Sequence, residues 1–293
     1  PPRYTGKPTL YLKDMTSATL QVPEGSRITL RFYGEVGALG LTETVSGPQE
    51  TDGTANDPVQ DFTVVQDGTI EITGSGGQNW QVAVIDDTPP QITIAGVAEA
   101  EATGEMTLPF TASDDHGVVA GQAVITLDPG AVSRRHGLVA EPEPRDAIVV
   151  PLPMPIAGDR RMFTETLIED FSKHPWANLP VMIQLSAEDA AGHVTEIDPA
   201  PMVLPARRFF DPLAAAVIEQ RRDLLWTRDN AGRVSQILRA ISHRPDGVFR
   251  SETAYLRLRV ILRRLETYSD YGLKAEQREE LAEALWGLAV LLE

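Results

Sequence analysis

The sequence predicts two tandem β-sandwiches followed by an α-helical hairpin or bundle. Up to about residue 205, short strands alternate with Gly- and Pro-rich turns at intervals of about 8–12 residues. From Phe209 onward, apolar residues recur at three- and four-residue steps, which is the period of an α-helix. A proline pair at residues 89–90 divides the β part, because proline cannot donate a hydrogen bond to a strand ladder.

These observations divide the chain into three parts. We expect one sandwich over residues 1–87, a second over residues 88–205 and the helical part over residues 206–293. The total length of 293 residues agrees with this division, since single domains seldom grow so large.

In the first part, alternating or continuous apolar residues predict strands within RITLRFYG (27–34), DFTVVQDGTIEITG (61–74) and NWQVAVID (79–86). The Asp67-Gly68 pair separates two such runs. An Asp-Gly pair suits a type I′ turn, in which both central residues have positive φ. The sequence therefore predicts a β-hairpin around Asp67-Gly68.

The second part contains five segments with the same strand pattern. They are EMTLPFTASDD (105–115), VVAGQAVITLD (118–128), DAIVVPLP (146–153), RMFTETL (161–167) and LPVMIQLSAEDAAGHVTEI (179–197). Antiparallel strands of this length, joined by short polar turns, are typical of a sandwich.

Three apolar stripes predict the helices of the last part. The first runs from Leu213 to Ile241, as one helix or as two joined near Gly232, and ends before Pro245. The others are Ala254, Leu258, Ile261, Leu265 and Tyr268, and then Leu281, Leu285, Leu288 and Leu292. Such stripes usually form the core of a bundle. The last stripe has no glycine cap or proline stop, so we expect this helix to continue beyond residue 293.

Charge and composition exclude several classes of protein. The net charge is −16, of which residues 1–204 contribute −18 and residues 205–293 contribute +2. An acidic surface repels phosphate backbones, so we expect no binding of nucleic acid. The chain contains no cysteine, which excludes disulfides and thiolate ligands and suits an oxidising compartment. It also lacks an apolar run of membrane-spanning length, so these residues are expected to be soluble.

The sequence contains no recognisable catalytic motif. It has no H-E-x-x-H pair, no G-x-S-x-G elbow and no phosphate-binding loop. The five histidines have no paired spacing, which predicts scattered surface or structural residues rather than a zinc site. We therefore expect a protein that is not an enzyme and has no cofactor apart from the calcium considered next.

Acidic loops of the second sandwich and its entry point have two interpretations that both stay open. In ASDDHGVV (112–119) and SAEDAAGHVTE (186–196), aspartates can accept hydrogen bonds from backbone N–H groups of tight turns. Alternatively, the loop carboxylates supply oxygen ligands for calcium, although their spacing matches no EF-hand or repeat-type calcium loop. The candidate calcium ligands are Asp86, Asp87, Asp114, Asp115, Glu188 and Asp189.

Several short segments of the sequence resemble known proteins. DDTPPQI, ASDDHGV and AEDAAG resemble bacterial immunoglobulin-like domains of the cell envelope. PPRYTGKPTLYL, HPWANLPVMIQLSAEDAAGHV and FFDPLAAAVIEQRRDL look like the domain-of-unknown-function 4175 family, over nearly the whole chain. The resemblance implies two immunoglobulin-like sandwiches in a periplasmic segment, which further sequence tethers to the inner membrane. The family has no assigned catalytic residues.

The helical part carries an unusual number of arginines. Residues 207–264 contain thirteen arginines, no lysine and six acids. Guanidinium groups pair with carboxylates in a bidentate manner, so these helices are candidates for contact with partner proteins. Solvated arginines, or arginines docked on the protein's own acidic sandwich, are the alternative. The candidate partner-binding residues are Arg221, Arg222, Arg228, Arg233, Arg257, Arg263 and Arg264.

Together these features predict a structural spacer and interaction module that binds other envelope proteins, whose identity the sequence does not give. A second hypothesis is a binding module for an envelope polymer such as glycan, with Trp80 or Trp176 on a sandwich face. An enzyme of unknown type is the third and weakest hypothesis.

Overall fold

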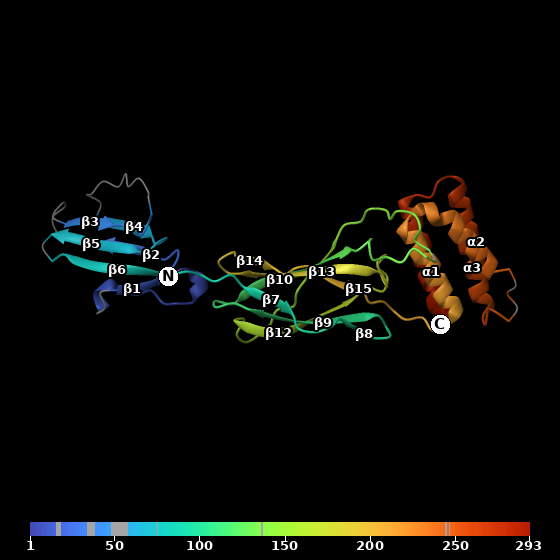
Figure 1. The fold of residues 1–293 in the computed structure, drawn as a ribbon, viewed down its shortest axis with the longest axis horizontal. Helices are drawn as coiled ribbons and strands as arrows, with labels where there is room; N and C mark the ends of the chain where they lie inside the picture. Colours follow the sequence, from blue (N-terminus) through green and yellow to red (C-terminus); the bar gives the residue numbers. More distant parts are fainter. Residues whose placement is uncertain are drawn as a thin grey trace.

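The computed structural model describes residues 1–15, 19–33, 39–47, 58–74, 76–135, 137–243, 245 and 247–293. It confirms the predicted fold class, two β-sandwiches followed by α-helices. The three parts follow one another along the long axis of the molecule, coloured blue to cyan, green to yellow and orange to red in Figure 1. None of the described helices is long and apolar enough to cross a membrane.

The first sandwich contains a four-stranded sheet and a two-stranded sheet. The larger sheet has the order β1 (Thr19–Pro23), β6 (Gln78–Ile85), β5 (Gly68–Gly74) and β3 (Leu39–Glu43), and β1 runs parallel to β6. The smaller sheet pairs β2 (Arg27–Arg31) with β4 (Val59–Thr63). Two short 3₁₀ turns, Arg3–Thr5 and Leu12–Asp14, precede β1. The core consists of Leu20, Ile28, Leu30, Val45, Val64, Ile70, Trp80 and Val82.

The predicted hairpin at Asp67-Gly68 is wrong. Strand β4 pairs with β2, whereas β5 pairs with β3 and β6, so the strands on either side of the Asp-Gly pair lie in different sheets. Gly68 is not among the glycines with positive φ, which a type I′ turn would require. Asp67 Oδ1 instead accepts a hydrogen bond from Val84 N at 2.7 Å. The pair therefore guides the chain from one sheet to the other.

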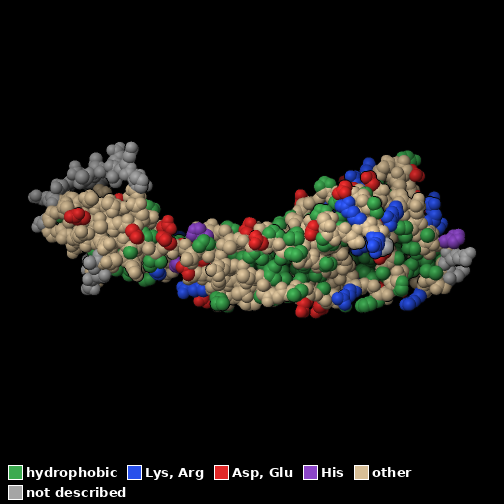
Figure 2. All heavy atoms as spheres, in the orientation of Figure 1, with side chains coloured by type: hydrophobic (Ala, Val, Ile, Leu, Met, Phe, Trp, Pro, Cys, Tyr) green, Lys and Arg blue, Asp and Glu red, His purple; other side chains and the backbone are tan. Residues whose placement is uncertain are grey.

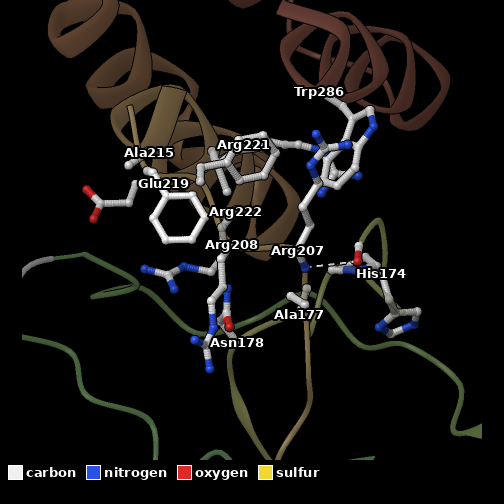
Figure 3. A pocket seen from close by; sticks show the side chains of 16 residues that line it. His174, Ala177, Asn178, Arg207, Arg208, Ala215, Glu219, Arg221, Arg222 and Trp286 are labelled. Atoms are coloured by element: carbon white, nitrogen blue, oxygen red, sulfur yellow. Dashed lines mark hydrogen bonds between the residues drawn. The ribbon is translucent and has the colours of Figure 1, made fainter. Parts of the chain in front are cut away.

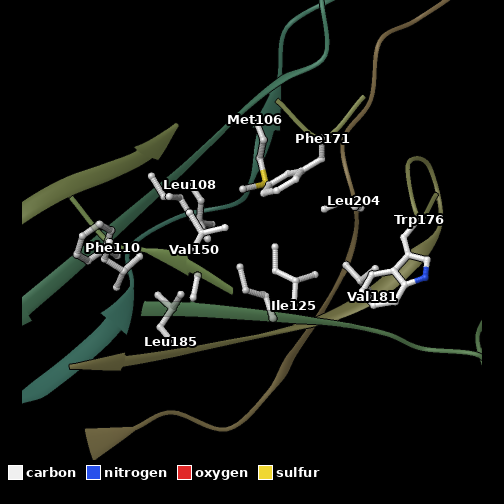
Figure 4. Packing of buried hydrophobic residues seen from close by; sticks show 14 of the residues in the cluster. Met106, Leu108, Phe110, Ile125, Val150, Phe171, Trp176, Val181, Leu185 and Leu204 are labelled. Atoms are coloured by element: carbon white, nitrogen blue, oxygen red, sulfur yellow. The ribbon is translucent and has the colours of Figure 1, made fainter. Parts of the chain in front are cut away.

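The second sandwich packs a five-stranded sheet against a four-stranded one. The first contains β11 (Ile148–Pro151), β10 (Val118–Leu127), β13 (Pro180–Asp189), β14 (Val194–Glu196) and β15 (Ala200–Val203). The second contains β12 (Met162–Asp170), β9 (Glu105–Ser113), β7 (Gln91–Ile94) and β8 (Glu99–Ala100). Large side chains such as Phe110, Ile125 and Leu185 from both sheets fill the space between them (Figure 4).

The helical part contains α1 (Pro212–Trp226), α2 (Ala231–Ile241), α3 (Glu252–Asp270) and α4 (Ala275–Leu292). Helix α4 contacts both α1 and α3, and α2 contacts α3. The predicted stripes form this core, which includes Val217, Leu238, Leu258 and Leu285. The first stripe forms two helices, separated by a 3₁₀ turn at Arg228–Asn230 rather than at Gly232.

The second sandwich and the helices share a contact surface. Trp226, the last residue of α1, belongs to the hydrophobic core of the second sandwich. The β10–β11 connection supplies part of the polar contacts of this surface. In it, Leu138 N donates to Asp223 Oδ1 at 2.9 Å, and Glu143 N donates to Trp226 O at 2.9 Å. The helices are therefore docked on the second sandwich through buried contacts.

Candidate functional site

The acidic loops predicted to hold a cation meet at one end of the second sandwich. Val118 at the start of β10 pairs with Asp189 at the end of β13, so the loops at these strand ends are neighbours. Gln91 at the start of β7 pairs with Ser113 at the end of β9. The strand register therefore brings the segment between the sandwiches to the same end as both loops.

At this junction the carboxylate of Asp87 lies between two imidazole rings. His116 Nδ1 is 2.9 Å from Asp87 Oδ1 and 3.1 Å from Asp115 Oδ2. His193 Nδ1 is 3.1 Å from Asp87 Oδ2 and 2.9 Å from Asp189 Oδ2. We call these five residues the junction cluster: Asp87, Asp115, His116, Asp189 and His193. It contains two groups of potential metal ligands that share Asp87.

Hydrogen bonds fix the carboxylates of the cluster. Asp189 Oδ1 accepts bonds of 2.7 to 2.9 Å from the backbone N–H groups of Ala191, Gly192 and His193, which leaves Oδ2 directed at the His193 ring. Asp115 Oδ1 accepts a bond of 2.9 Å from the Thr88 hydroxyl. These bonds therefore hold the carboxylates of Asp115 and Asp189 in place.

Burial and neighbouring charges raise the pKa values of residues in and beside the junction cluster. The side chain of Asp87 is only 4% exposed, and burial followed by the charge of Asp189 raises its pKa. The hydrogen bond with Asp189 raises the pKa of His193. The ring of Tyr4 packs edge-on to His116 at 5.3 Å, and burial followed by the charge of Asp87 raises the pKa of Tyr4.

The structure brings together three of the six candidate calcium ligands, Asp87, Asp115 and Asp189. Asp114 is buried beside them and behaves as a turn residue, since its Oδ2 accepts from His116 N and Gly117 N at 2.9 and 2.6 Å. Asp86 and Glu188 are exposed and belong to neither group of ligands.

The sequence did not predict that His116 and His193 lie close to one carboxylate. They are 77 positions apart in the sequence, so no ligand spacing reveals them, yet both contact Asp87. A signal was present in the two loops, which each place a histidine shortly after an aspartate: Asp115-His116 and Asp189-Ala-Ala-Gly-His193.

A second candidate site is a cavity of about 360 Å³ between the second sandwich and the helices. Arginines and aromatic rings line it, and Figure 3 shows Arg207, Arg208, Arg221, Arg222 and Trp286 around this space. Phe209 and Phe210 also line the cavity, and Phe210 is 73% exposed. Glu219 is the acidic residue of the lining. We call this the arginine pocket.

The floor of the arginine pocket depends on close backbone packing. Arg207 N donates to Ser172 Oγ at 2.9 Å, which joins the segment after β15 to the segment after β12. Gly104 lies against this bond with φ of +102°, and a Cβ there would be 1.9 Å from Ser172 Oγ. Glycine is therefore required at residue 104.

The predicted partner-binding arginines fall into different environments. Arg221 is buried, with only 7% of its surface exposed. It donates hydrogen bonds to Ala282 O and Lys173 O at 3.1 and 2.7 Å. Arg228 binds Glu143 at 2.8 Å, Arg233 lies 3.7 Å from Asp223, and Arg264 pairs with Glu280 at 2.7 Å. Arg257 and Arg263 are exposed on α3. Of the predicted set, Arg221 and Arg222 line the pocket.

The pocket also contains residues that sequence reasoning missed. Arg207 and Arg208 lie in the extended segment before α1, outside the helices for which the sequence predicted partner contacts, and Trp286 lies on α4. The guanidinium carbon of Arg221 lies 5.3 Å from the Trp286 ring centre, and that of Arg207 lies 5.4 Å from Phe209. These cation–π contacts join the aromatic and basic parts of the lining.

His174 also lines the pocket, and its surroundings lower its pKa. Burial, followed by the charges of Arg145 and Arg221, lowers the pKa of His174 to about 4. The ring is therefore neutral at pH 7, and its Nδ1 accepts a hydrogen bond from Trp176 N at 3.1 Å.

Comparison with solved structures finds proteins of low sequence identity. A DUF3823 family protein from Bacteroides ovatus is 9% identical over 61% of this chain and 99% of its own, with a TM-score of 0.25. Fibronectin(III)-like modules of Clostridium thermocellum CbhA are 13% identical over 67% and 94%, with a TM-score of 0.26. The Dpr2 Ig1-Ig2 structure is 14% identical over 66% and 62%, with a TM-score of 0.25.

Among curated proteins, no relative matches the chain. The family described as "Domain of unknown function (DUF4175)" matches all residues from 1 to 293. The chain therefore belongs to the DUF4175 family.

Proposed function

We propose that this chain is a non-catalytic interaction module of the periplasm, tethered to the inner membrane, whose arginine pocket binds an acidic segment of an envelope protein. The observation that carries the proposal is the set of arginines that line the pocket without a carboxylate partner. Among the described residues, Arg207, Arg208 and Arg222 form no ion pair, and Arg222 Nε is buried without a hydrogen-bond acceptor.

Charge and shape favour an acidic protein segment as the ligand. Four arginines against the single Glu219 give the lining an excess of positive charge. Guanidinium groups bind carboxylates through paired hydrogen bonds, and this pairing is strong where water is excluded. The rings of Phe209, Phe210 and Trp286 supply apolar area beside the charges. A peptide with Asp or Glu next to an apolar side chain satisfies both parts.

The order of the three parts along the molecule would make the pocket accessible to a partner protein. The two sandwiches and the helices lie in a row (Figure 1). The pocket is lined by residues of the helical part and of the adjoining second sandwich. On the face drawn in Figure 2, Lys and Arg side chains gather over the helical end. An extended spacer would therefore hold a basic binding surface away from its point of attachment.

The glycan hypothesis receives less support. Trp80 and Trp176 are 7% and 6% exposed and belong to the cores of their sandwiches. Neither indole can stack on a sugar from a sandwich face.

Site-specific photo-crosslinking in cells tests the proposal. A photoreactive residue at Phe210, on the pocket rim, should give defined adducts with envelope proteins, and Arg208→Glu or Arg222→Glu should abolish them. Arg257→Glu is the matched control, since Arg257 is exposed on α3 outside the pocket. Adducts that survive both pocket substitutions would overturn the binding proposal, and a fused reporter active only in the periplasm tests the location.

A further inference from the structure

We propose that the junction cluster binds a divalent transition-metal ion such as Zn²⁺, with Asp87 as the ligand shared by two His–Asp pairs. One pair is His116 with Asp115, and the other is His193 with Asp189. The site is separate from the arginine pocket and does not depend on the function proposed there.

The distances within the cluster are slightly shorter than those between ligands of one ion. Zinc binds imidazole nitrogen and carboxylate oxygen at about 2.0–2.2 Å, which places neighbouring ligand atoms about 3.3–3.6 Å apart in a tetrahedral site. The Nδ1 atoms of His116 and His193 lie 2.9 to 3.1 Å from their carboxylate oxygens. Small side-chain shifts would therefore complete the coordination geometry.

The donor atoms identify the class of cation. Calcium and magnesium prefer six or more oxygen ligands, whereas each group here offers one imidazole nitrogen and two carboxylates. Mixed nitrogen and oxygen ligands suit zinc and its first-row neighbours. This replaces calcium, the cation expected from the carboxylates alone, with a transition metal.

Unsatisfied atoms give independent support. His116 Nδ1 and Asp87 Oδ1 are buried and have no hydrogen-bond partner, although they lie only 2.9 Å apart. By contrast, His193 Nδ1 is within hydrogen-bonding geometry of Asp87 Oδ2. A buried polar atom without a partner is costly, and a cation bound to both of these atoms would satisfy both lone pairs.

The carboxylates also need a positive charge close by. Asp87 and Asp189 have side chains that are 4% and 1% exposed, and their charges act on one another. Buried like charges destabilise a fold unless a cation compensates them. Backbone donors hold Asp189 and the Thr88 hydroxyl holds Asp115, so outer hydrogen bonds of the kind that orient metal ligands are present.

Metal binding at this place would restrain the connection between the sandwiches. Asp87 lies two residues after β6 of the first sandwich, Asp115 lies in the β9–β10 loop of the second, and Asp189 is the last residue of β13. Tyr4, from the N-terminal segment, packs on His116. An ion held by these ligands would tie the linker to both loops and limit rotation of one sandwich against the other.

The experiment uses the whole 293-residue chain, stripped with a chelator and titrated with Zn²⁺ by calorimetry and by competition with a chromogenic chelator. We expect one or two ions per chain, since Asp87 offers one oxygen to each pair. His193→Ala should weaken Zn²⁺ affinity about tenfold or more. Loss of a residue that only hydrogen-bonds to a metal ligand already costs about tenfold, and loss of a ligand itself should cost at least as much. Co²⁺ should give a visible absorption band in the native protein that this variant loses.

Controls keep the test decisive. The side chain of His193 is 44% exposed, so its removal leaves no cavity in the core, and circular dichroism checks the fold. His243→Ala is the matched control, because His243 is exposed on the helical part and outside the cluster. Unchanged Zn²⁺ binding in His193→Ala, absence of Zn²⁺ binding, or preferential binding of Ca²⁺ would each overturn the proposal. Asp87→Asn, which removes the shared charge, should reproduce the loss.

Discussion

The indole Nε1 of Trp226 donates a hydrogen bond of 2.7 Å to the carbonyl oxygen of Ala140. This bond joins the end of helix α1 to the β10–β11 connection, while the indole ring packs into the core of the second sandwich. The helices and the second sandwich therefore share a core residue as well as a surface.

Trp226→Ala should weaken the coupling between these two parts. Loss of a large buried aromatic side chain costs about 3–5 kcal/mol. In the native protein, circular dichroism at helix and strand wavelengths should report one denaturant transition for the second sandwich and the helices. The variant should unfold its helices at lower denaturant concentration. Separate transitions in the native protein would contradict this view of the interface.

Gly104→Ala should destabilise the second sandwich and the floor of the arginine pocket. The added Cβ would meet Ser172 Oγ at 1.9 Å and Arg207 N at 2.4 Å, so the backbone must shift. Gly158→Ala is a matched control, since Gly158 also has positive φ, of +105°, but nothing within 4 Å. Thermal melting should show a much larger loss for residue 104; equal losses would mean that φ alone matters there.

Leu285→Asp should unfold the helical part. Leu285 is fully buried in the core of the bundle, where a charged group has no partner. Val290→Asp on the same helix is the control, because Val290 is 39% exposed. Helix signal at 222 nm should fall in the first variant and persist in the second. Unchanged melting of Leu285→Asp would show that the stripe is not in a core.

His174 should make the stability of the protein depend on pH. Its pKa is about 4 in the folded protein and about 6.5 in the unfolded chain, so the unfolded state binds more protons between these values. The contribution of neutral His174 to the free energy of unfolding is fully present above pH 6.5, and it is lost as the pH falls toward 4. His174→Gln should therefore lose less stability than the native protein between pH 7 and pH 4.5 in urea titrations. Parallel losses in the two proteins would refute this role.

Asp114→Ala should destabilise the turn between β9 and β10. The substitution removes two hydrogen bonds from backbone donors, each worth about 1 kcal/mol. Asp114→Asn keeps an acceptor and should lose less. Asp86→Ala is the control, because Asp86 is exposed. Chemical denaturation measures all three, and equal stability of Asp114→Ala and Asp86→Ala would argue against the turn role.

The helices were predictable because their burial is local in sequence. The stripe Leu258, Ile261 and Leu265 faces the core at the spacing that a helix imposes. The hairpin at Asp67-Gly68 failed for the opposite reason. Turn chemistry describes four residues, whereas the choice of sheet for β4 and β5 depends on partners far away in the chain, such as β2 and β3.

The candidate sites show the same limit. Three carboxylates of the junction cluster were found from their loops, but His116 and His193 meet only because Val118 pairs with Asp189. Arg207 and Arg208 were counted in the arginine-rich region but were not named as candidate partner-binding residues, because they lie in an extended segment, where periodicity carries no information. Both sites depend on strand register and on the docking of the helices against the second sandwich. Long-range packing decides both, and short sequence segments do not reveal it.

The parallel pairing of β1 with β6 has a mechanical consequence. The register runs from Thr19 opposite Gln81 to Pro23 opposite Ile85. A tension applied between Thr19 and Ile85 would pull the two strands along their length in opposite directions. The hydrogen bonds between them would then be sheared together, instead of opening one at a time like a zipper. The pairing of β1 with β6 thus resists a tension applied between these two strand ends.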